Sequence, residues 1–275
     1  MQVATTIAQA RALFEVLPRP VGFVPTMGAL HAGHLELVRR AKEECVSVVA
    51  SVFVNPLQFG ANEDLEKYPR NFDADRAALE KTGVAVLFAP DVSTMYPEGF
   101  TTVVDTGVIG TRYEGEIRPT HFRGVTTVVN KLLNIVRPDF LYLGQKDAQQ
   151  TAVLRKMVRD LEMPVSVVIV PTVREDDGLA RSSRNVYLSP EERAAAPSLL
   201  AALLALRDEL VSGKDKSQAI EAARKHVNAR GSIDYLDVVD ADTFEPIETL
   251  RSPAFVIGAA RFGNTRLLDN LWIAP

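Results

Sequence analysis

The chain has 275 residues, of which 47% are hydrophobic and 24% are charged, an ordinary composition for one large globular domain or two smaller ones. The formal net charge of -4 gives no global positive field, so we expect no nucleic acid as a partner. The single cysteine, Cys45, excludes an intrachain disulfide and fits a reducing compartment. No apolar run is long enough to span a bilayer and no targeting segment is visible, so we expect a cytoplasmic protein without a membrane partner.

The first part of the sequence alternates apolar runs with helical spacing. Residues 3–17 predict an amphipathic helix that ends before Pro18. Short runs rich in apolar and β-branched residues predict five buried strands, over 21–24, 47–54, 84–88, 140–143 and 165–170. Helical spacing predicts helices from residue 35 onward and over 73–81, 122–136 and 148–161. This alternation predicts an α/β fold with a Rossmann-like, doubly wound parallel sheet.

After Pro171 the pattern changes. Residues 174–184 are charged and contain a glycine, which indicates a linker and a mobile loop. Residues 190–212 and 217–229 predict two helices, and three short strands are expected over 233–239, 254–260 and 265–272. We therefore expect residues 1–172 to form the Rossmann-like domain and residues 173–275 to form a second, smaller α+β domain.

The most informative stretch is GFVPTMGALHAGHLELVRRAK, residues 22–42, in which a strand, a glycine-containing loop and a helix follow one another. This layout presents backbone N–H groups and the positive end of a helix dipole to an anion. His31 and His34 lie three residues apart on one side of the helix start, and Gly33 removes a Cβ between them. A zinc site is less favoured, because no cysteine or further histidine lies at ligand spacing nearby. The pattern favours a phosphate, although a histidine at a helix start is often an ordinary polar residue.

Two further clusters suit a nucleotide. Lys146 and Asp147 follow a predicted strand at the same sheet edge, where the lysine could neutralise phosphate and the aspartate could accept from ribose hydroxyls. Ser182 and Ser183, with arginines on both sides, offer several donors and no carboxylate to a polyphosphate. The first cluster could equally be a plain solvated loop, and a run such as the second, taken alone, is more often a plain surface loop. P-loop, dinucleotide-binding and G-x-S-x-G signatures are absent from the sequence.

Five motifs, in this order and spacing, carry a resemblance over nearly the whole chain: PTMGALHAGH, FVNPLQFG, RPTHFRGV, GQKDAQQ and GLARSSRN. Together they resemble the pantoate–β-alanine ligase family of the nucleotidylyltransferase superfamily. The resemblance implies that ATP and pantoate form pantoyl adenylate and pyrophosphate, after which the amine of β-alanine displaces AMP. It also implies Mg²⁺ as a cofactor, a homodimer, and a C-terminal domain that acts as a lid.

The resemblance assigns roles to particular residues. The residues implied to contact the phosphates and support catalysis are His31, His34, Lys146, Ser182, Ser183 and Arg184. The ATP site would be completed by Met27, Gly33, Gly144 and, on the ribose, Asp147. Pantoate would be held by Gln58 and Gln150, in a pocket shaped by Met27 and Phe53, with Arg118 beside it. Asp75 would lie in the magnesium environment.

The sequence departs from the family pattern at two positions. Gln145 stands where glutamate is frequent, and Arg181 stands where an apolar residue is usual, which leaves the role of Arg181 open. Another H-x-G-H nucleotidylyltransferase that transfers AMP to a small molecule is the alternative enzyme. A tRNA synthetase would need a tRNA-binding surface that this short acidic chain does not show. A non-catalytic nucleotide-binding regulator would have little reason to keep both histidines.

Overall fold

The computed structural model describes residues 1–60, 63 and 65–275 and divides the chain into two compact units. Unit 1 comprises residues 1–144 and 153–170, and unit 2 comprises residues 145–152 and 171–275. The short segment 145–152 thus groups with the C-terminal part of the chain. Among the described residues, none of the helices has both the length and the apolar character needed to cross a bilayer.

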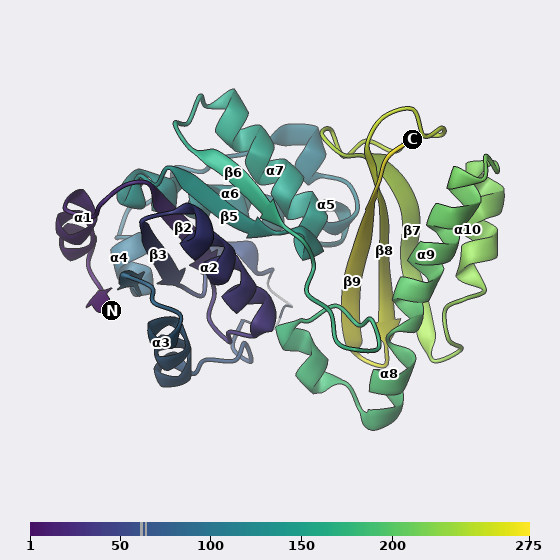
Figure 1. Ribbon diagram of the computed structural model, residues 1–275, viewed down its shortest axis with the longest axis horizontal. Helices are drawn as coiled ribbons and strands as arrows, with labels where there is room; N and C mark the ends of the chain where they lie inside the picture. The colour runs from purple at the N-terminus through teal and green to yellow at the C-terminus, as the bar shows by residue number, and fades with distance from the viewer. Residues whose placement is uncertain (61–62, 64) are drawn as a thin grey trace. The chain divides into compact units, whose positions relative to one another are not determined.

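Unit 1 is built on a six-stranded parallel sheet with the order β1-β4-β3-β2-β5-β6 (Figure 1). The strands are β1 (Gln2–Ala4), β2 (Val21–Thr26), β3 (Ser47–Val52), β4 (Val86–Phe88), β5 (Phe140–Gly144) and β6 (Ser166–Val170). The main helices between them are α1 (Ile7–Glu15), α2 (Ala32–Glu44), α3 (Phe72–Lys81), α6 (His121–Val136) and α7 (Ala148–Asp160). The short helices α4 (Val92–Met95) and α5 (Glu114–Ile117) precede α6. The chain leaves β2 toward β3 and later returns to β5 on the other side of β2. The strand order therefore reverses between β2 and β5, where ligands bind in doubly wound folds.

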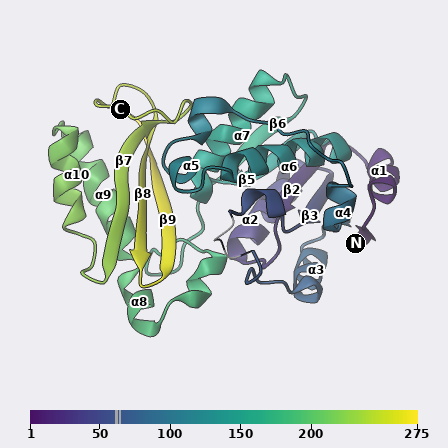
Figure 2. The same cartoon turned by 180° about the vertical axis from the view of Figure 1, so that it is seen from behind.

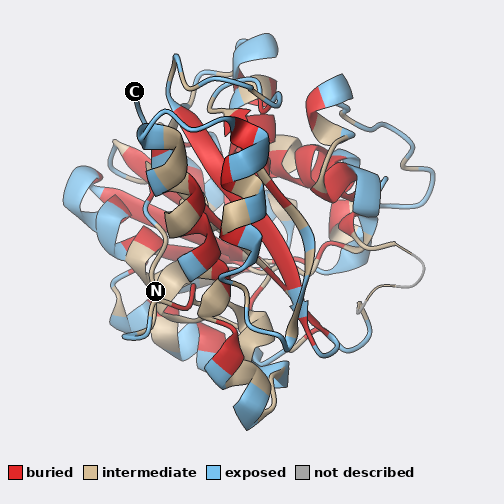
Figure 3. Ribbon diagram, turned by 90° about the vertical axis from the view of Figure 1, so that its right-hand side faces the viewer, coloured by how far each residue is buried: buried red, intermediate tan, exposed pale blue. Residues whose placement is uncertain are grey.

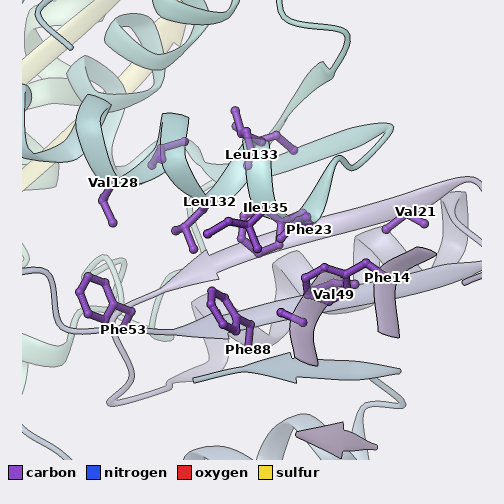
Figure 4. Close-up of a cluster of buried hydrophobic side chains, with 14 of the residues drawn as sticks. Phe14, Val21, Phe23, Val49, Phe53, Phe88, Val128, Leu132, Leu133 and Ile135 are labelled. Atoms are coloured by element: carbon purple, nitrogen blue, oxygen red, sulfur yellow. The ribbon is translucent and has the colours of Figure 1, made fainter. Parts of the chain in front are cut away.

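Both faces of this sheet are buried, as the expected runs of apolar residues require. On one face, Phe23, Val49 and Phe88 pack with residues of α6 such as Leu132 and Ile135 (Figure 4). On the other face, alternate residues of the same strands pack with α2 and α3 in a second cluster that includes Val24, Val48, Ala50, Leu87, Leu37, Val38 and Leu79. The doubly wound parallel sheet predicted from the sequence is confirmed.

The N-terminus differs from the expectation of one helix over 3–17. Residues 2–4 form an edge strand, in which Gln2 N–H donates to the Ala85 carbonyl at 2.9 Å and Val3 pairs with Leu87. The helix begins only after Thr6, whose hydroxyl accepts from Gln9 N–H at 3.3 Å. The prediction was wrong here because helical spacing continues through residues that the sheet takes up as a sixth strand.

Unit 2 combines a three-stranded antiparallel sheet, ordered β7-β8-β9, with helices (Figure 2). Its strands are β7 (Gly231–Asp240), β8 (Ala254–Phe262) and β9 (Thr265–Ile273), and its helices are α8 (Pro190–Ala195), α9 (Ser198–Val211) and α10 (Lys216–Arg224). Leu199, Leu203 and Leu206 of α9 share one buried cluster with Val256 and Ala260 of β8. The expected smaller α+β fold is thereby confirmed, and Figure 3 shows buried residues along the strands and exposed residues on outer helix surfaces and loops.

Two helix predictions in unit 2 were wrong in extent. The single helix expected over 190–212 is divided at Ala196 and Pro197, because proline has no N–H to continue the hydrogen-bonding pattern of α8. The helix expected over 217–229 ends at Arg224. Beyond it, the chain tightens into i to i−3 bonds, such as His226 N–H to the Ala223 carbonyl at 3.0 Å. Helical spacing of apolar residues continues past the break at residues 196–197 and past the helix end at Arg224. The spacing alone therefore did not reveal either boundary.

A short turn after β3, η1 (Pro56–Gln58), lies directly against α6. A Cβ added to Gly124 of α6 would lie 2.2 Å from the Leu57 carbonyl oxygen, well inside contact distance. The Gly124 carbonyl in turn accepts from the Asn55 side-chain amide at 3.1 Å. Glycine is therefore required at position 124 because two backbones meet there.

The first turn of α6 adds a buried imidazole to the same contact. His121 Nδ1 lies 3.0 Å from the Gln58 carbonyl oxygen, and its Nε2 lies 3.3 Å from Nη1 of Arg118. A guanidinium can only donate, so Nε2 accepts and Nδ1 carries the proton that is donated to Gln58. Burial, followed by the positive charge of Arg118, lowers the pKa of His121 to about 4. The ring is thus neutral in the folded protein over most of the pH range.

We expect Gly124→Ala to destabilise unit 1. The added methyl group would push α6 away from the turn, and overpacking of this kind costs about 1–3 kcal/mol. The free energy of unfolding, measured with urea, should fall by at least the upper part of that range. Gly110→Ala is the matched control, because its Cβ would meet its nearest neighbour at an ordinary 3.4 Å. Equal stability of the two variants would contradict the close approach.

The neutral state of His121 predicts a specific loss of stability in acid. Below the unfolded-state pKa of 6.5 the unfolded chain gains a proton that the folded chain takes up only near pH 4, so stability falls between these values and then levels off. The loss amounts to about 3 kcal/mol at most. His121→Gln should flatten the unfolding free energy between about pH 6.5 and 4.5. The same substitution at the exposed His226 should leave the slope unchanged, and an unaltered slope in His121→Gln would refute the assignment.

Candidate functional site

The turn from β2 into α2 has an uncommon backbone, held by one carboxylate. Gly28 has φ +81° and Ala29 has φ 51°, so two consecutive residues occupy the left-handed region, which costs energy for the alanine. Asp75 of α3 compensates: its two oxygens accept from Ala29 N–H at 2.9 Å and from Leu30 N–H at 2.8 Å. Asp75 is only 5% exposed, and this contact fixes where α2 begins.

His31 and His34 cap the start of α2 through each other's backbone. His31 Nδ1 accepts from Gly33 N–H at 3.1 Å, and His34 Nδ1 accepts weakly from His31 N–H at 3.4 Å. The ring centroids lie 4.1 Å apart. Because a backbone N–H can only donate, each Nδ1 is unprotonated and the proton of each neutral ring sits on Nε2. The two rings thus carry a matched pair of Nε2–H donors at the positive end of a helix.

Gly33 is needed for a reason that the sequence analysis did not identify. A Cβ at this position would lie 2.9 Å from Cε1 and 3.0 Å from Nδ1 of His31. The space beside the backbone of Gly33 is therefore taken up by the imidazole of His31. Glycine lets the ring of His31 fold over the first turn of the helix and accept its hydrogen bond.

After β3, a network of buried amides determines how Gln58 is oriented. Asn55 is 0% exposed; its Oδ1 accepts from Leu57 N–H at 3.3 Å and its Nδ2 donates to the Gly124 carbonyl at 3.1 Å. These backbone partners leave no choice of amide orientation. Asn55 Nδ2 also donates to Gln58 Oε1 at 3.1 Å, so the Gln58 amide N–H₂ is the group left to bind a ligand. Sequence reasoning missed Asn55, although it lies within the quoted motif FVNPLQFG.

Arg118 reaches the same turn from the end of α5. Its Nη2 donates to the Gln58 carbonyl at 3.1 Å, and its Nε lies 2.9 Å from both oxygens of Glu63. Burial raises the pKa of the Glu63 carboxyl, but hydrogen bonds and charge from Arg118 outweigh it and hold that pKa below its usual value. Arg118 therefore stabilises the chain around Gln58, and this contact already occupies much of its guanidinium.

Met27 and Phe53, the two apolar residues expected to shape a substrate pocket, line one hollow of unit 1. Its volume is about 330 Å³, and its other lining residues include Gly28, Asp75, Arg70 and Phe72. Gly144 lies at the end of β5, the strand beside β2 on the other side of the order reversal. The structure thus gathers Met27, the two histidines and Gly144 at the carboxyl ends of neighbouring strands.

The remaining predicted residues belong to unit 2. Lys146 and Asp147 lie in the turn η3 (Gln145–Asp147), with Lys146 Nζ 3.2 Å from Asp147 Oδ1, and the half-buried Gln150 follows in the first turn of α7. Ser182 precedes the turn η4 (Ser183–Tyr187), and its Oγ accepts from Arg184 N–H at 3.2 Å.

Lys146, Ser182 and Arg184 line one pocket of this unit, so segments almost 40 residues apart in sequence come together. Arg181, the unusual residue of the loop, pairs with Glu175 at 2.9 Å.

Comparisons with known proteins identify the family of the chain. The family model described as pantoate-beta-alanine ligase matches residues 2–272. The chain is 52% identical to a pantothenate synthetase of Thermus thermophilus, over 100% of both chains, and 50% identical to that of a Roseiflexus species, over 98% of both.

Solved structures give the same result. The crystal structure of the Thermus thermophilus pantothenate synthetase matches with a TM-score of 0.95 at 51% identity, with both chains fully covered. The ligase from Francisella tularensis, described as complexed with beta-gamma ATP and beta-alanine, matches with a TM-score of 0.81 at 34% identity, over 98% of this chain and 97% of its own. The chain therefore belongs to the pantoate–β-alanine ligase family.

Proposed function

We propose that this ligase activates pantoate with ATP as pantoyl adenylate and then transfers the pantoyl group to β-alanine. The observation that carries the proposal is the pair of histidines at the start of α2, whose Nδ1 atoms accept from the backbone and whose protons therefore sit on Nε2. Two neutral donors at a helix N-terminus suit a phosphoryl group that gains negative charge in its transition state. A ligase that joins a carboxylate to an amine needs this phosphoryl transfer. A carboxylate resists attack by an amine until one of its oxygens has become part of a leaving group, and the transferred phosphoryl group provides that leaving group.

In the first step, a pantoate carboxylate oxygen attacks the α-phosphorus of ATP and pyrophosphate leaves. His31 and His34 donate to the transferring phosphoryl group, while Lys146, Ser182, Ser183 and Arg184 bind the phosphates and Asp147 accepts from the ribose. Met27, Gly33 and Gly144 complete the ATP site. The shared pocket of Lys146, Ser182 and Arg184 supports this assignment, because cations and hydroxyl donors converge there.

In the second step, the amine of β-alanine attacks the acyl carbon, loses a proton, and AMP leaves with the bridging oxygen. Gln58 and Gln150 hold pantoate, with Met27 and Phe53 along its apolar part. The fixed orientation of the Gln58 amide supports its role as a donor to a pantoate oxygen. Arg118 acts from beside the site by holding the Gln58 turn, to judge from its bonds to the Gln58 carbonyl and to Glu63.

Magnesium is part of the proposal only as a companion of the nucleotide. Each oxygen of Asp75 accepts one backbone N–H of the β2–α2 turn, so its observed role is to hold that turn, and its place in the magnesium environment stays a prediction. Within residues 1–60, 63 and 65–275, no group of three or more His, Cys, Asp or Glu side chains could hold a metal ion. Mg²⁺ is commonly bound through substrate phosphates and few protein groups, and no step of the mechanism given above depends on it.

Three further assignments stay proposals that rest on family membership. We propose that the protein is a homodimer and acts in the cytoplasm. We also propose that residues 1–172 bind ATP and pantoate while residues 173–275 act as a lid over ATP. Protection of the arginines in the 178–185 loop from proteolysis by added ATP would support the lid.

Exchange of labelled pyrophosphate into ATP tests the stepwise reaction. It should require pantoate and proceed without β-alanine, because adenylation precedes the arrival of the amine.

His34→Ala and His31→Ala should each reduce this exchange about 10²- to 10³-fold with unchanged circular dichroism, the usual effect of removing one transition-state donor. His226→Ala, at an exposed histidine of unit 2, is the control. Exchange only in the presence of β-alanine would exclude the two-step mechanism.

The path of oxygen tests which phosphorus is attacked. With ¹⁸O in the pantoate carboxylate, mass spectrometry should find the label in AMP and none in pyrophosphate, because the bridging oxygen leaves with AMP. Attack at the γ-phosphorus would instead give an acyl phosphate and ADP. Unlabelled AMP, or ADP as product, would defeat the mechanism even if pantothenate were formed.

A further inference from the structure

Two consecutive residues of β9, Asp269 and Asn270, hold the two segments of unit 2 that the proposed function assigns to the phosphates. The segments are the Lys146 turn, residues 145–147, and the serine loop, residues 174–184. They are separated by an entire helix and strand in sequence, so something other than chain connectivity must set their spacing. Neither Asp269 nor Asn270 belongs to the residues assigned to ATP or pantoate.

Asn270 attaches the Lys146 turn. Its Nδ2 donates to the Gln145 carbonyl at 2.9 Å and to the Lys146 carbonyl at 3.0 Å, and its Oδ1 accepts from Gln145 Nε2 at 3.2 Å. Asn270 is 3% exposed. Because carbonyl oxygens can only accept, the orientation of this amide is fixed. The side chain is hydrogen-bonded to the carbonyl groups on both sides of the Lys146 Cα. The direction in which Lys146 leaves the turn therefore depends on Asn270.

Asp269 attaches the serine loop through Arg174. The pair is bidentate, with Nη1 to Oδ2 at 2.6 Å and Nη2 to Oδ1 at 2.9 Å, and Asp269 is 6% exposed. Nη1 of Arg174 also donates to the Gly178 carbonyl at 3.0 Å, and Arg174 forms a β-bridge with Ala180. The base of the loop is thus closed and fixed to β9 two residues before Ser182. A bidentate arginine–carboxylate pair defines orientation as well as distance.

We infer that Asp269 and Asn270 are positioning residues that set the spacing of Lys146 relative to Ser182 and Arg184. The shared pocket supports this, since Lys146, Ser182, Arg184 and Asp269 all line it. Bringing donors from two segments onto one polyphosphate requires their separation to be right within a fraction of an ångström, and a misplacement of about 1 Å can cost roughly 10²-fold in rate. The inference rests on the proposed role of these groups at the phosphates.

A double-mutant cycle distinguishes positioning from simple structural support. Asn270→Ala should reduce kcat/KM for ATP in pantoate-dependent pyrophosphate exchange about 10- to 100-fold. Lys146→Ala should reduce it as well, and the double variant should be no worse than Lys146→Ala within about threefold, because Asn270 acts through Lys146. Asn270→Asp should be more harmful than Asn270→Ala, because it directs a carboxylate at two carbonyl oxygens. Asn270→Ser, which keeps a donor, should recover part of the loss.

Asp237→Asn serves as the matched control for loss of stability. It breaks an ion pair in the same sheet, Lys216 Nζ to Asp237 Oδ1 at 2.7 Å, on β7, which pairs with β8 and not with β9. Its exchange rate should stay within about threefold of the parent at a temperature where thermal denaturation shows every variant folded. Effects of Asn270→Ala and Lys146→Ala that multiply would overturn the positioning role. Parental exchange in Lys146→Ala would instead refute the proposed phosphate role, and the inference would fall with it.

Discussion

The carboxylate of Asp75 is the contact on which the histidine site most depends. The chain must leave the end of β2 and enter α2 within a few residues, and it does so through two left-handed residues, Gly28 and Ala29. A backbone in this conformation persists only where surrounding contacts over-determine it. Two hydrogen bonds to a buried carboxylate supply that restraint, and they come from a helix more than 40 residues further along the chain. The position of both imidazoles follows from this turn.

The sequence predicted the frame of unit 1 well because its signals are local. A strand covered on both faces reads as an unbroken apolar run, and β3 and β5 could be recognised in that way. The predicted helix bounds were wrong where another feature of the chain overrode helical spacing. Residues 2–4 kept helical spacing yet joined the sheet edge, and Pro197 interrupted a segment whose alanines and leucines favour a helix on both sides.

The site was predicted only in part, for a related reason. Histidines, lysines and serines that stand in recognisable motifs can be assigned a candidate role from the sequence alone. The role of a buried polar residue becomes visible only when its hydrogen-bond partners are known. Asn55 bonds to Gly124, 69 residues away, and Asn270 bonds to Gln145, 125 residues away. No local pattern contains such a pair. The sequence also did not show that the ring of His31 folds over Gly33, whose missing Cβ makes room for it.

The mutual capping of His31 and His34 limits which side chains positions 31 and 34 can accept. Each residue takes a hydrogen bond from the main chain through Nδ1. The proposed function also requires each ring to donate a proton to the phosphate through Nε2. Lysine and arginine would attract phosphates more strongly, but they have no acceptor with which to begin the helix. Among side chains that can carry positive charge, only imidazole also accepts. The start of the helix therefore favours histidine at these positions independently of any ligand, and each ring is uncharged as long as its Nδ1 accepts from the main chain.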